Sequence, residues 1–430
     1  MSDARGRGRD PTATDVPAAP NPSRRRFLGW VGAAGLGAAA GIGGTAIAGR
    51  SSGSTEIAGP EGDEVVPFYG AHQAGITTQR QAHLLFASLD VVDESRATIG
   101  ALFRYWTGAA ARMTRGGSIS AAGDAQGVLW DTGEAAGLDP SRLTITFGVG
   151  PTLFTKEGTD RLGLASARSA ALADLPPFEH DALDPAASGG DVCIQACADD
   201  EQVAVHAVRE LLRLGHGLVR VRWSQPGFVP RDPTGATPRN LLGFKDGTAN
   251  IDPRDGDALR RFVWVGSEGP AWLRGGTILV ARRVNMHIDR WDGSTLADQE
   301  AVIGRRKGSG APLSGRAERD PLDLTALGSN GVPLIAPDAH IRLASPDSND
   351  GQRILRRPYS FVDRDGGEGN LSAGLFFLAY QRDPARQFVA IQRRLDASDA
   401  LNEYVRHTGS AVFAMLPGVE PGGVLADGLF

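Results

Sequence analysis

A carboxylate in a glycine-rich turn is the first candidate for chemistry. Asp246 lies in the stretch LLGFKDGTANID, with Gly243 three residues before it and Gly247 directly after it. A tight turn accounts for the glycines but not for the acid. A calcium-binding loop of the EF-hand type needs glycine at its sixth position and glutamate at its twelfth. Counted from Asp246, these positions hold Ile251 and Asp257, so we reject a calcium site.

Histidine and arginine supply the other candidates. Among eight histidines, His340 is distinctive because it follows a long Gly- and Pro-rich loop, in APDAHIRLASP, and Arg356 comes sixteen residues later in ILRRPYSF. His206 lies in a predicted amphipathic helix and His216 directly follows it, and both are interpreted as structural. His287 lies on a predicted strand without the third ligand that zinc requires. We find no P-loop and no HExxH or CxxC motif, and the one match to GxSxG, at residues 49–53, lies in the N-terminal segment before the predicted strands and helices.

Composition limits the class of protein. The chain has 430 residues, 41% of them hydrophobic, and a net charge of −5, which argues against nucleic acid as the main partner. The only cysteines, Cys193 and Cys197, lie four residues apart on a predicted strand. Four residues of strand span about 13 Å, too far for a disulfide, so both are predicted to be packed thiols.

The elements that must position these residues fall into two halves. In the first half, strands are predicted at 83–91, 142–154, 191–199 and 217–228, and helices at 93–116 and 201–215. The order strand–helix–strand–strand–helix–strand is that of a ferredoxin-like unit.

The second half repeats this theme less clearly. Strands are predicted at 275–292, 340–345 and 375–383, a helix from about Ser294 to 307, another helix at 385–405, and a long loop at 307–331. We therefore predict an α+β fold of two ferredoxin-like domains, 63–250 and 251–430, in a dimeric α+β barrel-type arrangement.

The N-terminal residues predict export. Arg24 and Arg25 stand in a Ser-Arg-Arg-x-Phe-Leu pattern, followed by an uncharged, glycine-diluted run and by small residues at 46–48. This pattern resembles a twin-arginine (Tat) signal, predicted to cover 1–48 and to be cleaved, with a flexible linker at 49–62. We expect a periplasmic, cell-envelope or extracellular protein. Since the Tat system moves folded proteins, the signal also suggests a bound cofactor.

Taken in order, several motifs resemble one family. GFKDGTANI contains Gly-x-x-Asp-Gly, and DAHIRLASP and LRRPYSF follow it; GAHQAGITT, GRRKGSGAPL and LFFLAYQRDPARQF agree. Together they resemble the dye-decolourising peroxidases, haem proteins with two ferredoxin-like domains, over nearly all of residues 65–430. The Tat signal is similar to that of the exported branch, which includes a deferrochelatase/peroxidase partner of bacterial iron-uptake systems.

The resemblance implies roles for named residues. His340 is similar to the proximal ligand of haem b, with one haem per chain, Asp246 to the distal acid–base residue, and Arg356 to the distal arginine. Pro358 departs from the pattern, because some members carry a polar residue there. Further haem-contacting positions implied in this way are Gly247, Thr248, Ala249, Ser345, Pro346, Leu375 and Phe377.

Three functions remain open at this point. One is a peroxidase that reduces hydrogen peroxide and oxidises dyes, phenols or other organic donors. Another is a haem-binding protein that releases iron for an iron-uptake system. The third is an exported binding protein without haem. The resemblance also leaves open a partner such as an iron permease or a copper oxidase, and a homo-oligomer.

Overall fold

The computed structural model describes residues 64–119, 131–230, 236–363 and 371–430. Contacts divide the chain into two units, Met1–Ile57 and Ala58–Phe430, and all the described residues belong to the second. The predicted signal peptide and linker lie outside the described residues. None of the helices in the described ranges is long and apolar enough to cross a membrane.

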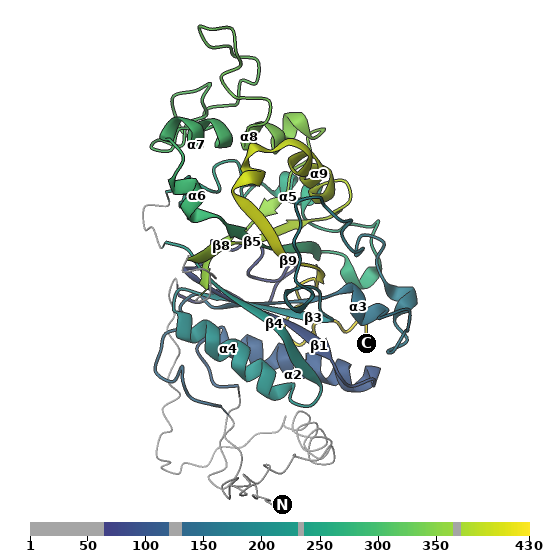
Figure 1. Ribbon diagram of the computed structural model, residues 1–430. Helices are drawn as coiled ribbons and strands as arrows, with labels where there is room; N and C mark the ends of the chain where they lie inside the picture. The colour runs from purple at the N-terminus through teal and green to yellow at the C-terminus, as the bar shows by residue number, and fades with distance from the viewer. Residues whose placement is uncertain (1–63, 120–130, 231–235, 364–370) are drawn as a thin grey trace, which may run out of the picture. The chain divides into compact units, whose positions relative to one another are not determined.

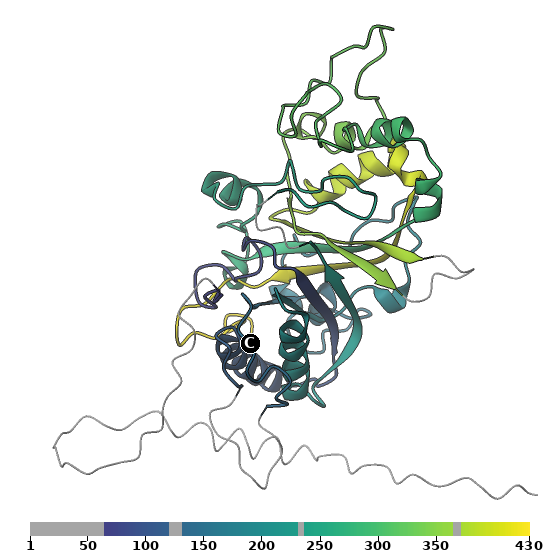
Figure 2. The same cartoon turned by 90° about the vertical axis from the view of Figure 1, so that its left-hand side faces the viewer.

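The first half folds in the predicted order. Both of its long helices begin at capping residues, since Ser95 accepts from the N–H of Thr98 and Asp200 from those of Gln202 and Val203. Its elements are β1 (His83–Val91), α2 (Arg96–Met113), β2 (Thr144–Val149), β3 (Val192–Ala198), α4 (Glu201–Leu214) and β4 (Val219–Phe228). Helices α2 and α4 cover one side of β1, β3 and β4 (Figures 1 and 2).

The second half has the same order of elements. They are β5 (Thr277–Met286), α7 (Leu296–Ile303), β7 (Tyr359–Asp363), β8 (Ser372–Gln381), α9 (Phe388–Ser398) and β9 (Val405–Met415). Shorter pieces are α3 (Pro151–Phe154), α5 (Gly256–Phe262), α6 (Ile288–Asp292), α8 (His340–Leu343) and β6 (Leu355–Arg356). The predicted boundary between residues 250 and 251 lies in the connection from β4 to β5 and stays a prediction.

Hydrogen bonding closes the strands into a barrel. Within the described residues the order is β5-β9-β2-β3-β1-β4-β7-β8, and β8 pairs back with β5. Every pair is antiparallel. Each half contributes four strands. Numbered along the sequence of that half, these strands lie side by side in the order 4-1-3-2, which is the ferredoxin-like order. The two halves join through β2–β9 and β4–β7, which confirms the predicted fold class.

The barrel interior is packed mainly with apolar side chains, together with a buried Tyr380–Gln195 hydrogen bond. It contains Phe86, Phe376 and Phe413 from three different strands, each at most 1% exposed. Cys193 and Cys197 on β3 are both buried and free, as predicted. Because side chains fill this interior, a cofactor-sized site must lie outside it.

Three local predictions for the second half were wrong. Residues 340–345 do not form a strand. His340–Leu343 form the short helix α8, and the N–H of Ala344 bonds to the carbonyl of His340. A short alternating run fits either state, and here the segment packs against α7 and α9. The strand predicted at 275–292 ends at Met286 and α6 follows. The helix predicted at 385–405 ends at Ser398, and the 11-residue strand β9 after it was not predicted.

Candidate active site: a cavity between β5, β8, β9 and α8–α9

A cavity of about 290 Å³ lies in the second half of the fold. Its apolar wall comes from β5, β8, β9 and α9, and includes Val284, Met286, Leu375, Phe377 and Ile391. Helices α8 and α9 lie close together above this part of the sheet (Figure 1). All ten candidate residues named from the sequence line the cavity: Asp246, Gly247, Thr248, Ala249, His340, Ser345, Pro346, Arg356, Leu375 and Phe377.

Asp246 and Arg356 form an ion pair at the cavity. The Arg356 Nη1 donates to Asp246 Oδ1 over 2.7 Å, and the two side chains are 26% and 12% exposed. Asn250 fixes their relative position, since its side-chain amide accepts from the backbone N–H of Arg356 (2.8 Å) and donates to the carbonyl of Arg356 (2.7 Å). The sequence analysis quoted Asn250 in its motif but assigned it no role.

Glycine backbone geometry creates the turn that carries Asp246. Gly243 has a φ of 84° and Gly247 a φ of 134°, which favours glycine at both positions. A Cβ at Gly243 would also lie 2.6 Å from the Lys307 side chain. The backbone N–H of Asp246 donates to the carbonyl of Pro238 over 2.8 Å. The glycines thus serve the turn, and the turn directs the acid into the cavity.

His340 faces the cavity from another direction, at the start of α8. Its Nδ1 lies 2.6 Å from Asp399 Oδ2, and the Asp399 side chain is 3% exposed. Burial lowers the pKa of His340, but the Asp399 carboxylate outweighs burial, so the net pKa is raised. With Nδ1 bonded to a carboxylate, Nε2 is the ring nitrogen available to a metal. Sequence reasoning missed Asp399, because nothing in the pattern links residues 59 positions apart.

Several cationic side chains also line the cavity. Arg282, which is 1% exposed, pairs with Asp181, and its Nε has no hydrogen-bond partner within the described part of the chain. Burial lowers the pKa of Arg282. Burial, with Arg282 nearby, also lowers the pKa of His407 to about 3, so His407 is neutral at physiological pH. Arg305 and Arg353 line the same cavity.

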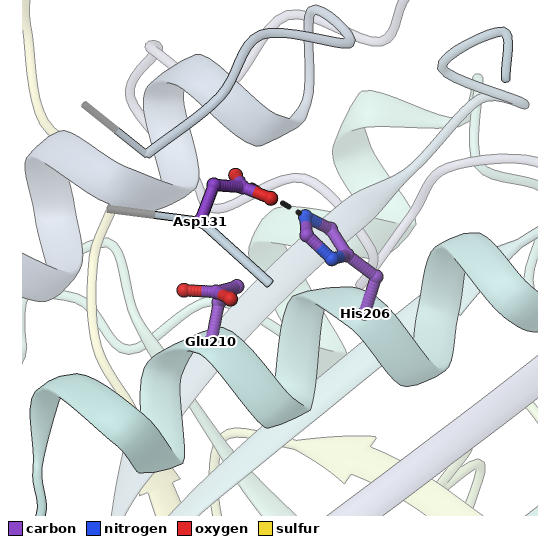
Figure 3. Close-up of side chains that lie close together, drawn as sticks. All are labelled: Asp131, His206 and Glu210. Carbon is purple, nitrogen blue, oxygen red and sulfur yellow. Dashed lines mark ion pairs between the residues drawn. The ribbon is translucent and has the colours of Figure 1, made fainter. Parts of the chain in front are cut away.

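A second cluster of ionisable side chains lies outside the cavity, on and beside α4. Asp131, His206 and Glu210 approach one another closely enough to suggest a metal site (Figure 3). However, Glu210 Oε1 accepts two hydrogen bonds from Thr132, and Oε2 is paired with Arg213. A guanidinium on the third ligand disfavours a cation. We interpret the cluster as an ion-pair network, in agreement with the structural role predicted for His206.

Comparison with known proteins identifies the family. The family model described as Dyp-type peroxidase, N-terminal, matches residues 73–229, and the model described as Dyp-type peroxidase, C-terminal, matches residues 237–420. The chain therefore belongs to the Dyp-type peroxidase family.

Relatives and solved structures agree with this assignment. A deferrochelatase of Escherichia coli (strain K12) is 37% identical over 409 residues, covering 93% of this chain and 94% of that protein. Ferric DtpA from Streptomyces lividans is 39% identical with a TM-score of 0.79, covering 85% of this chain and 97% of that one. A DyP-type peroxidase from Cellulomonas bogoriensis is 42% identical with a TM-score of 0.78, covering 86% and 98%. The expectations of a peroxidase and of a haem cofactor are confirmed at this level.

The cavity suits a haem on the evidence of its own residues. Apolar side chains form its walls, and the buried guanidinium of Arg282, which is paired with Asp181, has an unbonded Nε–H that can donate to an anionic group. A histidine whose Nδ1 is already bonded to a carboxylate has the arrangement typical of a metal ligand. The acid–arginine pair lines the same cavity as this histidine. The donor set therefore fits iron held by one imidazole.

Proposed function

We propose that this protein is a haem b peroxidase, with one haem per chain, that reduces hydrogen peroxide and oxidises dyes, phenols or other organic donors. The observation that carries this proposal is that one cavity presents both the Asp399-bonded His340 and the Asp246–Arg356 pair. In this proposal His340 Nε2 would hold the iron, and Asp246 and Arg356 would act on the peroxide. The bound haem supplies the iron centre at which peroxide is reduced.

Asp246 moves the proton that peroxide cleavage requires. Its carboxylate takes the proton from the inner oxygen of the peroxide and returns it to the outer oxygen, which leaves as water. Because Arg356 is bonded to Oδ1, Oδ2 is the oxygen available for this transfer. The anion that forms on the outer oxygen is stabilised by the guanidinium of Arg356.

The remaining candidate residues hold the cofactor. Leu375 and Phe377 provide apolar surface from β8. The backbone after the acid and the turn after α8 approach the cofactor edge through Gly247, Thr248, Ala249, Ser345 and Pro346. In this proposal these residues exclude water and fix the cofactor, and they take no part in proton transfer.

Replacement of the acid tests the mechanism. Asp246→Asn should slow the reaction of the haem-loaded protein with peroxide by about 100-fold or more, since general acid–base groups contribute this much. Haem content should not change. Asp252→Asn is the matched control, because Asp252 lies in the same loop, its side chain is 49% exposed, and its ion-pair partner Arg254 is 90% exposed. A peroxide reaction of Asp246→Asn as fast as that of the control would overturn the role of Asp246.

The names of the relatives favour a second candidate function, iron release from haem. The proteins named deferrochelatase match 93% of this chain. Two measurements on the haem-loaded protein separate the candidates: oxidation of a dye by peroxide, and release of metal-free porphyrin under reducing conditions, detected by fluorescence. Sustained dye oxidation without porphyrin release supports the peroxidase, and the reverse result supports iron release.

Export and partners are also proposals. The Ser23–Leu28 pattern supports Tat-dependent export to the periplasm, the cell envelope or the exterior, and the deferrochelatase relatives support a partner in iron uptake. A reporter fused to residues 1–48 should be exported, and replacement of Arg24 and Arg25 by lysine should stop its export. Retained export of the double variant would exclude the Tat route.

A further inference from the structure

Asp246 sits on a loop, and loops position side chains less precisely than helices or strands do. The nearest regular element before it, β4, ends at Phe228, and the next, α5, begins at Gly256. Beyond its bonds to Arg356 and to the carbonyl of Pro238, its position depends on what holds the two flanks of the turn. Both flanks are held by one carboxylate, that of Glu318, which comes from the long loop between α7 and α8.

Glu318 contacts three side chains around the turn. Its Oε1 accepts hydrogen bonds from the hydroxyls of Thr237 (2.5 Å) and Thr248 (3.0 Å). Its Oε2 forms an ion pair with the ammonium of Lys245. Lys245 directly precedes Asp246 and Thr248 lies two residues after it, so Glu318 ties together both sides of the acid.

The loop that carries Glu318 is itself anchored at the cavity. The Arg305 Nη1 donates to the backbone carbonyl of Glu318 over 3.0 Å and to that of Gly310 over 2.8 Å. Arg305 is 7% exposed and lines the cavity. The backbone that carries the Glu318 carboxylate is therefore held in place by Arg305.

The ion pair with Lys245 is partly shielded from water. The Lys245 and Glu318 side chains are 20% and 17% exposed. Burial raises the pKa of Glu318, but hydrogen bonds and charge from Lys245, Thr237 and Thr248 outweigh it and lower this pKa to about 2. Glu318 is thus an anion at any physiological pH, and it neutralises an ammonium one residue away from the acid.

Lys245 is the reason this neutralisation matters. Lys245 lines the same cavity as Asp246 and carries a flexible four-carbon side chain. Without its anionic partner, the ammonium gains most by pairing with the nearest remaining carboxylate. Of the two carboxylates that line the cavity, Asp246 and Asp399, Asp246 is the one adjacent to Lys245 in the chain, and its oxygens are needed for Arg356 and for the proton.

We propose that Glu318 is a positioning residue of the active site, which fixes the Asp246 turn and withholds Lys245 from Asp246. This inference rests on the proposed proton-transfer role of Asp246. Glu318 does not touch the reacting atoms, and it acts through the two residues that flank the acid.

Glu318→Gln in the haem-loaded full chain tests the proposal. Glutamine keeps an oxygen for Thr237 and Thr248 and places an NH₂ group where Oε2 faces Lys245. Two rates are measured by stopped-flow: the reaction with peroxide, and the association of cyanide with ferric haem, which needs a base to remove the proton of HCN. Both rates should fall about tenfold. In Glu318→Gln/Lys245→Met, both should return to within about threefold of the wild-type rates.

Two reference variants fix the interpretation. Glu300→Gln removes a carboxylate that pairs with Arg306 near the same loop and makes no contact with Asp246 in the described structure, and it should leave both rates unchanged. Asp246→Asn in the same assays tests the proposed function. If Asp246→Asn reacts normally, the proposed function fails; if it is slow while Glu318→Gln reacts normally, only this inference fails.

Rescue by Lys245→Met is the decisive result, because a structural role of Glu318 alone predicts none. If Glu318→Gln is slow and the double variant is equally slow, the proposal is overturned. The same criterion holds for haem content, measured by the Soret band. If Glu318→Gln binds no haem and the double variant does, the proposal stands; if neither binds haem, it is overturned.

Discussion

Replacing Asp399 by asparagine should weaken haem binding through the proximal histidine. The Asp399 carboxylate serves two donors at once: Oδ2 pairs with His340 Nδ1 at 2.6 Å, and Oδ1 accepts from the backbone N–H of Leu401 at 2.9 Å. An asparagine side chain has one oxygen. In Asp399→Asn, either the imidazole or the Leu401 N–H therefore loses its acceptor. Water cannot easily replace that acceptor, because the Asp399 side chain is only 3% exposed.

The size of the effect follows from this geometry. A hydrogen bond to a charged group contributes about 1.5–3 kcal/mol and a neutral one about 0.5–1.5 kcal/mol. The difference of about 1–2 kcal/mol corresponds to a loss of roughly 5- to 30-fold in affinity. This range overlaps the loss of about 10- to 100-fold typical when the carboxylate partner of a ligating histidine is removed. We therefore expect haem affinity to fall by about tenfold.

The assay is the transfer of haem to excess apomyoglobin, followed by absorbance. Asp338→Asn is the matched control, because Asp338 is exposed and lies two residues from His340. This substitution removes the same charge but breaks no hydrogen bond to the imidazole ring. Asp399→Asn should release haem about tenfold faster than the control. Equal release rates for the two variants would refute the argument that Asp399 supports the ligand.

Other variants test the remaining assignments. His340→Ala should abolish the Soret band of the purified protein while far-UV circular dichroism is retained; a normal band would show that another residue holds the iron. Arg356→Leu should slow the stopped-flow reaction with peroxide by about 100-fold without reducing haem content, and an unchanged rate would remove Arg356 from the mechanism. The pKa of Glu318 is lowered to about 2 in the folded protein, below the value of about 4.3 for free glutamate. Its stabilising contribution is therefore complete above about pH 5 and disappears as the pH falls toward 2. In urea unfolding, Glu318→Gln should cost about 1 kcal/mol above pH 5, since solvent screens the ion pair, and progressively less in acid, whereas a pH-independent difference would contradict the lowered pKa.

The first half of the fold could be predicted from local pattern. Its strands alternate or are continuously apolar, and its helices begin at Ser95 and Asp200 with the side-chain caps that these residue types favour. The periodicity of side chains follows directly from backbone geometry, so β1 was predicted with its observed bounds.

The second half was harder to predict because tertiary contacts decide it. The segment at 340–345 alternates like a strand, yet it forms α8, which packs against α7 and α9. Strand β9 is the reverse case. It pairs with β5 along most of its length and with β2 at its end, and these partners come from both halves of the chain.

The candidate site shows the same division. Asp246, His340 and Arg356 are recognisable from the sequence, because each stands in a short motif. The motif is recognised either from the local geometry that its residues require or from its resemblance to the family. The partners that fix them are not recognisable in this way: Asp399 is 59 residues from His340, and Glu318 is 73 residues from Lys245. A carboxylate that pairs with a distant residue leaves no local pattern, since its hydrogen bond depends on distance in space and not on spacing along the chain. The sequence by itself therefore determined which residues could do the chemistry, and only the closed barrel and its loops decided which side chains hold them in place.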